Sequence, residues 1–175
     1  DEEAEEPISL AEVAFVNRKP MSPSVSLNQI APTTRDSLLV ELVTPSLDAD
    51  GDFVDYEYEW FKNDEAVTQI SGSIVPTDLT KKGDQWRVRV TPNDGYEKGE
   101  PAEATVEVIN SSPKLSLSIT STLARSADDI TVSAFVSDAD EDEMVVTFRW
   151  LLDGTEVQKR SVPTTNLVTD VLTFD

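Results

Sequence analysis

The chain reads Asp48-Ala49-Asp50-Gly51-Asp52 at one point and Asp138-Ala139-Asp140-Glu141-Asp142 at another, displaced by 90 residues. Eight residues after the last acid of each pentapeptide stands a tryptophan, Trp60 in the first copy and Trp150 in the second. In both copies apolar side chains alternate with polar ones on the way to this tryptophan, which is the pattern of a half-buried β-strand. This agreement at a single offset predicts a tandem repeat of about 90 residues.

The beginnings of the two copies agree as well, with Ser22-Pro23 matched by Ser112-Pro113 at the same displacement. We therefore place a first repeat at residues 18–110 and a second at residues 111–175. Residues 1–17 combine an acidic tail with a segment, residues 8–17, that is similar to the end of the first repeat. We expect that segment to be the last strand of a preceding repeat.

The second repeat is predicted to be incomplete at its C-terminus. It has no counterpart of Trp86-Arg87-Val88-Arg89-Val90 or of the closing strand at residues 104–110. A window cut from a longer array would begin and end inside repeats in this way. A sandwich without its final strands exposes unpaired backbone, so we expect residues 111–175 either to be less ordered than residues 18–110 or to be completed by a following segment or by a strand of another molecule.

Period-two alternation runs through most of the chain, and turn signals such as Asp50-Gly51, Asn93-Asp94-Gly95 and Asp153-Gly154 interrupt it at short intervals. No stretch has a convincing helical period with caps. About seven short strands per repeat, with a tryptophan in the third, is the pattern of an immunoglobulin-like β-sandwich. The predicted fold class is all-β, built from tandem sandwich repeats.

Composition excludes several classes of function. The 175 residues hold 34 acids and 14 bases, and the net charge of −20 disfavours binding to nucleic acid. Histidine and cysteine are both absent, which removes imidazole bases, thiolate nucleophiles, Cys/His zinc sites and disulfides. No apolar run approaches the length of a membrane span.

These motifs resemble bacterial tandem immunoglobulin-like repeats, which are related to cadherin-like and polycystic-kidney-disease (PKD) type domains. The resemblance rests on residues 48–52, the strand containing Tyr56, Tyr58 and Trp60, and the turn at residues 90–95. It departs from the narrower families, because the junctions lack a cadherin-type Asx linker and the PKD signature is not intact. The resemblance implies stalks or adhesive arms of extracellular, cell-surface or periplasmic proteins, often with bound calcium.

The aspartate-rich loops are the candidate chemistry. Calcium takes six to eight oxygen ligands, and alternating aspartates in a loop supply several of them. The alternative is that these are polar turns, in which aspartate stabilises an Asx-turn. The candidate calcium ligands are Asp48, Asp50, Asp52, Asp94, Asp138, Asp140 and Asp142.

Two functions remain open. One is a structural or adhesive module, a stalk, spacer or fibre segment whose partners are neighbouring repeats, other copies of itself, or a surface protein or glycan. The alternative is a ligand-recognition module for carbohydrate or protein, accessory to an enzyme or receptor. Exposure of either Trp86 or Tyr96 in a row with other aromatic residues on an open face would favour recognition, whereas burial of both would favour the spacer. We expect no enzymatic activity, because the many acids show no constellation that stands out.

Overall fold

A computed structural model describes residues 16–120 and 128–173 of the chain. Their strands form antiparallel sheets, and the only helical element among them is a short 3-10 turn, η1 (Thr77–Leu79). The predicted all-β fold class is therefore confirmed. No helix in the described part of the chain is long and apolar enough to cross a membrane. The strand expected at residues 8–17 lies almost entirely outside the described residues.

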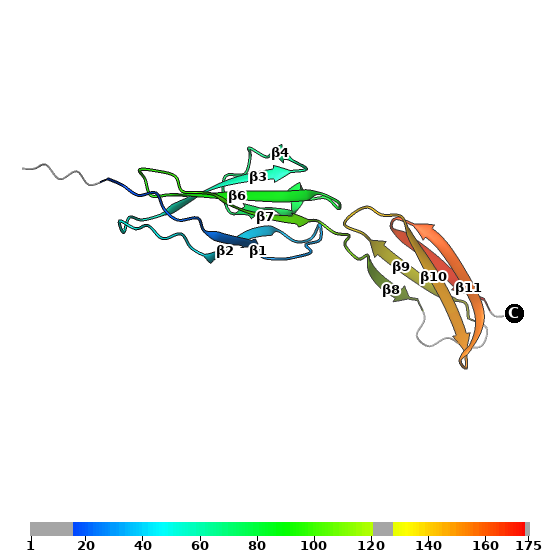
Figure 1. Ribbon diagram of the computed structural model, residues 1–175. Helices are drawn as coiled ribbons and strands as arrows, with labels where there is room; N and C mark the ends of the chain where they lie inside the picture. Colours follow the sequence, from blue (N-terminus) through cyan, green and yellow to red (C-terminus); the bar gives the residue numbers. More distant parts are fainter. Residues whose placement is uncertain (1–15, 121–127, 174–175) are drawn as a thin grey trace, which may run out of the picture.

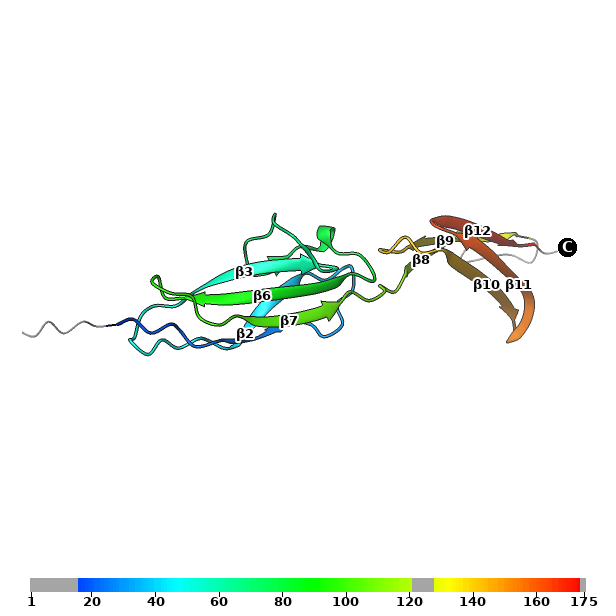
Figure 2. The same cartoon turned by 45° about the horizontal axis from the view of Figure 1, so that its top comes forward.

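The first seven strands form two sheets, and we call residues 18–110 unit 1 (Figures 1 and 2). One sheet has the order β1-β2-β5 and the other the order β4-β3-β6-β7. The strands are β1 (Ser24–Leu27), β2 (Leu38–Thr44), β3 (Asp55–Lys62), β4 (Glu65–Ala66), β5 (Ile74–Val75), β6 (Gln85–Asn93) and β7 (Ala102–Glu107).

The core of unit 1 lies between its two sheets. Alternation decides which side chains enter it, since every second residue of β6 from Trp86 to Pro92 is buried. The rings of Trp60 and Trp86 meet edge to face, with centroids 6.0 Å apart. The buried apolar residues of this core are Leu38, Val40, Trp60, Val75, Trp86, Val88, Val90, Val106 and Val108.

The last five strands form a second pair of sheets, within residues 111–175, which we call unit 2. One sheet has the order β12-β9-β8, and the other consists of β10 and β11. The strands are β8 (Lys114–Ile119), β9 (Ile130–Ser137), β10 (Met144–Leu152), β11 (Thr155–Thr164) and β12 (Leu167–Leu172). The buried apolar core of unit 2 is small: Ala134, Val136, Val146 and Phe148.

The 90-residue displacement has a structural counterpart in two hairpins. Lys62 of β3 lies opposite Glu65 of β4, and Leu152 of β10 lies opposite Thr155 of β11, in the same relative register. The two-residue turns between them have positive φ angles, as hairpin turns of this length require. β10 is thus the counterpart of β3, and β11 takes the place of β4.

The two tryptophans occupy corresponding strands but differ in burial. Trp60 is 1% exposed and donates its indole N–H to the carbonyl of Gly72. Trp150 is only half-buried and donates to the carboxylate of Asp170 on β12. The repeat itself predicts equivalent buried positions for the two tryptophans. The difference arises because, in the described part of the chain, Trp150 has no counterpart of Trp86 packed against it.

The two units lie end to end, joined by the short segment between β7 and β8 (Figure 1). Among the described residues, every strand pairing joins strands of the same unit. The boundary at residue 110 is consistent with this but stays a prediction.

Candidate metal centre

In unit 1 the loop between β2 and β3 folds around the carboxylate of Asp48. Its Oδ1 accepts the backbone N–H of Asp50 at 2.7 Å and that of Asp52 at 3.2 Å. This is the local turn that aspartate stabilises, and Gly51 completes it with a φ of 85°. The loop is therefore held by its own polar groups, as the polar-turn interpretation predicts.

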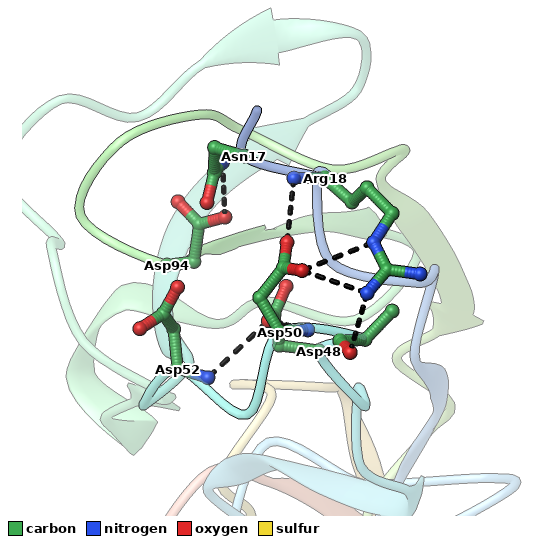
Figure 3. A network of polar contacts seen from close by, with 7 residues as sticks. Asn17, Arg18, Asp48, Asp50, Asp52 and Asp94 are labelled. Atoms are coloured by element: carbon green, nitrogen blue, oxygen red, sulfur yellow. Dashed lines mark hydrogen bonds and ion pairs between the residues drawn. The ribbon is translucent and has the colours of Figure 1, made fainter. Parts of the chain in front are cut away.

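Arg18 binds the central aspartate of this loop. Its guanidinium lies 2.7 Å and 3.0 Å from Oδ1 of Asp50, and its backbone N–H donates to Oδ2 at 2.8 Å (Figure 3). The hydrogen bonds from Arg18 lower the pKa of the Asp50 carboxyl below its usual range. The positive charge that a metal ion would bring to Asp50 is thus supplied by a side chain.

Asp94, from the loop after β6, comes to the same end of unit 1 (Figure 3). Its Oδ1 accepts the backbone N–H groups of Tyr96 and Glu97, and its Oδ2 accepts the amide of Asn17 at 3.0 Å. These bonds, that of Glu97 first, lower the pKa of the Asp94 carboxyl. The two loops do share one end of the unit, but Asp94 has its own partners there.

Unit 2 brings its three aspartates together. Carboxylate oxygens of Asp138, Asp140 and Asp142 lie within 4.8 Å of one another, the one group of three or more acids so gathered among the described residues. The local fold repeats that of unit 1, since Oδ1 of Asp138 accepts the backbone N–H groups of Asp140 and Asp142 at 2.8 and 3.3 Å. The sequence pattern alone did not distinguish this group as the better gathered one.

Partners of this cluster come from unit 1 and from the junction. The ammonium of Lys82 forms an ion pair with Asp142, and the backbone N–H of Ser111 donates to Oδ2 of Asp140 at 2.6 Å. Burial raises the pKa of Asp140, but the hydrogen bonds from Ser111 and Thr34 together with the charge of Lys82 outweigh it, so the pKa is lowered. The ion pair with Asp142 raises the pKa of Lys82.

The donor set fits a hard cation. Three carboxylates supply oxygen ligands, and Oδ1 of Asp140 is buried without a hydrogen-bond partner, as is Oδ2 of Asp48 in unit 1. An unpaired buried carboxylate oxygen is costly, and coordination of a cation would satisfy it. The cluster in unit 2 can therefore bind a metal ion. Whether the seven aspartates act as calcium ligands stays a prediction.

The partners of these acids were missed by sequence reasoning. The signal for Arg18 lay in the two junctions, since Asn17-Arg18 aligns with Asn110-Ser111 and only the first carries a cation. Nothing in the spacing pointed to Lys82, which reaches the cluster from unit 1.

The two aromatic side chains that bear on ligand recognition differ in exposure. Trp86 is buried at 1% exposure, whereas Tyr96 is 76% exposed on the loop that carries Asp94. Trp60 is also in the core, so neither of these two tryptophans is available for stacking on a sugar.

No protein-family profile matches the chain. No curated protein matches it either.

Proposed function

We propose that the chain is a structural module, two consecutive immunoglobulin-like sandwich units that act as a spacer in an extracellular repeat protein. Each unit has its own core between two antiparallel sheets, which suits a repeat that folds by itself and contacts mainly its neighbours. The cell surface or periplasm follows from the family resemblance, and we assign the module no catalysis.

The fastening of the junction carries this proposal. Side chains of unit 1 hold the connecting segment, because Thr34 hydrogen-bonds the hydroxyl of Ser111 at 2.7 Å and Arg35 donates to the carbonyl of Ser112 at 2.8 Å. Unit 2 holds the same segment through Asp140, and Lys82 adds an ion pair between the units. A connection bonded on both sides resists bending, and force-bearing or distance-setting spacers need that property.

We further propose that calcium at Asp138, Asp140 and Asp142 stiffens this junction. Binding of the cation would fix the loop that grips Ser111, and it would compete with Lys82 for Asp142. The three carboxylates repel one another where the fold brings them together. A divalent cation bound among them therefore lowers the free energy of the folded state more than that of the unfolded chain. Binding of the cation would then break the ion pair between Lys82 and Asp142 and make the aspartate loop more rigid.

A distance measurement tests the spacer. The chain has no native cysteine, so Thr68→Cys in unit 1 and Lys159→Cys in unit 2 place spin labels at two exposed sites. We expect a single narrow distance distribution by electron-electron dipolar spectroscopy, narrower still with calcium. A broad distribution in the unaltered junction would refute a stiff spacer.

Two variants serve as controls for the same measurement. Lys82→Gln together with Arg35→Gln removes both cationic contacts at the junction and should broaden the distribution in the absence of calcium. Lys98→Gln removes an ion pair with Glu57 inside unit 1 and should leave the distribution unchanged. Asp138→Asn should abolish the narrowing by calcium.

Ligand recognition remains the second candidate, on the exposure of Tyr96. Phe53 is 85% exposed in the loop that also carries Asp52, so two aromatic rings are open on loops at one end of unit 1. Binding to a panel of glycans that Tyr96→Ala and Phe53→Ala both weaken would favour this function. Equal binding by the two variants and the parent chain would leave the spacer as the one remaining candidate function.

A further inference from the structure

Strand β10 is paired along one edge only. Its partner is β11, and the two form a sheet by themselves in the described part of the chain. The corresponding strand β3 has β4 on one side and β6 on the other. Since β11 takes the place of β4, the free edge of β10 corresponds to the edge of β3 that pairs with β6.

Within the described residues, no strand covers the second sheet of unit 2 at the matching place. In unit 1, β7 lies alongside β1, where Val25 and Leu27 are partly buried against the core. Their counterparts on β8, Leu115 and Leu117, are each 59% exposed. A row of exposed leucines next to a free strand edge is an interaction surface rather than an ordinary solvent face.

A groove joins these two features. A cavity of about 410 Å³ lies between β8 and β10, lined by side chains that include Leu115, Met144, Val145 and Val146. Trp150 is only half-buried on the β10 side, whereas Trp60 in unit 1 is covered by Trp86 of β6. The free edge of β10, the exposed leucines of β8 and the half-buried indole of Trp150 are together complementary to a hairpin like that of β6 and β7.

We propose that the groove between β8 and β10 binds a β-hairpin of the β6–β7 type. Its first strand pairs antiparallel with β10 and directs an aromatic residue onto Trp150. Its second strand covers Leu115 and Leu117. In the register of β3 and β6, Glu59 lies opposite Arg89. Arg149 stands at the place of Glu59 and already forms an ion pair with Glu156 of β11 at 2.7 Å, so the bound hairpin carries no basic residue opposite it.

Two other occupants fit less well. Residues 11–17 are similar in sequence to residues 104–110, which contain the end of β7, so they lack the strand that pairs directly with a β10-type edge. Edge-to-edge pairing of β10 between two copies would satisfy the backbone but leave Leu115 and Leu117 exposed. Only a hairpin covers both sheets.

The test extends the 175-residue chain after Asp175 with a copy of residues 76–110 in which Arg89 is replaced by glutamate. We expect backbone amides of residues 144–152 and 114–119 to exchange with deuterium at least tenfold more slowly than in the unextended chain. The matched control extension carries Val88→Asp and Val90→Asp as well, which prevents its strand from packing inward. Equal exchange in the two extended proteins would overturn the proposal.

A change in the groove tests the same interface from the other side. Leu115→Glu with Leu117→Glu alters exposed side chains, so the unextended chain should keep its melting temperature. In the extended chain the same pair should abolish the slow exchange, and retention of it would overturn the proposal. Concentration-dependent dimerisation of the unextended chain with protection of residues 144–152 would show a second copy at the edge, and would also overturn it. These readouts are separate from the inter-unit distance that tests the spacer.

Discussion

Ser111 anchors unit 2 through Asp140, since its backbone N–H lies 2.6 Å from Oδ2 of that side chain. Arg18 makes the same contact with Asp50 at 2.8 Å, so in each unit the central aspartate of the loop binds the backbone N–H of the unit's first residue. The repeated pentapeptide thus binds the backbone at the start of each unit through a carboxylate. The two contacts differ in the side chain of the residue whose N–H is bound: Arg18 carries a guanidinium and Ser111 a hydroxyl.

Arg18→Ser should give unit 1 a calcium response. The substitution keeps the backbone N–H bond to Asp50 and removes the guanidinium, leaving the carboxylates of Asp48, Asp50 and Asp52 without a counter-ion. Calcium that binds only the folded state then raises the melting temperature by mass action. We expect a rise of several degrees for unit 1 by calorimetry in millimolar calcium compared with chelator.

Arg18→Lys is the matched control for that variant. It retains a positive charge beside Asp50 and should respond to calcium no more than the parent chain does. An equal calcium response in the serine and lysine variants would show that the positive charge at residue 18 is not what blocks the site.

Asp170→Ala should destabilise unit 2 by about 2–3 kcal/mol, because it leaves the half-buried donors of Trp150 and Gln158 without their acceptor. Asp170 is 1% exposed and accepts hydrogen bonds from Trp150 at 2.7 Å and Gln158 at 3.1 Å. Arg160 pairs with its other oxygen at 3.1 Å. These contacts join β12 of one sheet to β10 and β11 of the other. Urea unfolding monitored by deuterium exchange of unit 2 measures the loss, and Asp170→Asn, which keeps an acceptor for Trp150, should lose less.

Stability of unit 2 should fall in acid through the same residue. Burial raises the pKa of Asp170, but the hydrogen bonds from Trp150 and Arg160 outweigh it, so the folded-state pKa lies below the unfolded value near 3.9. A depressed pKa contributes stability above the unfolded value, and that contribution is lost as pH falls through the folded value. Unfolding free energy measured from pH 6 to pH 2 should therefore decline below about pH 4. The decline should be shallower in Asp170→Asn, and parallel curves would contradict this assignment.

The sequence was a good guide where the signal was local. Alternation placed the strands containing Trp60 and Trp150, and the Asp-rich spacing placed two loops whose internal hydrogen bonds are the same in both units. A carboxylate that bonds an N–H two residues along the chain depends only on near neighbours, so the pattern carries that information.

Contacts between distant parts of the chain could not be predicted from local sequence patterns. The contact of Arg18 with Asp50 spans 32 residues and that of Lys82 with Asp142 spans 60. Long flexible cations beside many acids have numerous possible partners, and only the fold selects one. The role of Asp170 was also hidden, because a single aspartate within an alternating strand looks like a solvent-facing residue until the opposite sheet is placed against it.

Glu141 is strained, and relieving the strain should stabilise unit 2. Its φ angle is 59°, in the left-handed region, where the Cβ of any residue other than glycine crowds the backbone, and the corresponding residue in unit 1 is Gly51 at 85°. Glutamate also adds a negative charge beside three aspartates that already repel one another. Glu141→Gly removes both costs, although glycine returns part of the gain by loosening the unfolded chain. We expect a net gain of about 0.5–1 kcal/mol in the unfolding free energy of unit 2 without calcium. Glu141→Gln keeps the backbone strain and removes only the charge, so it separates the two contributions. A glycine variant no more stable than the glutamine variant would show that repulsion, and not the φ angle, is the cost at this position.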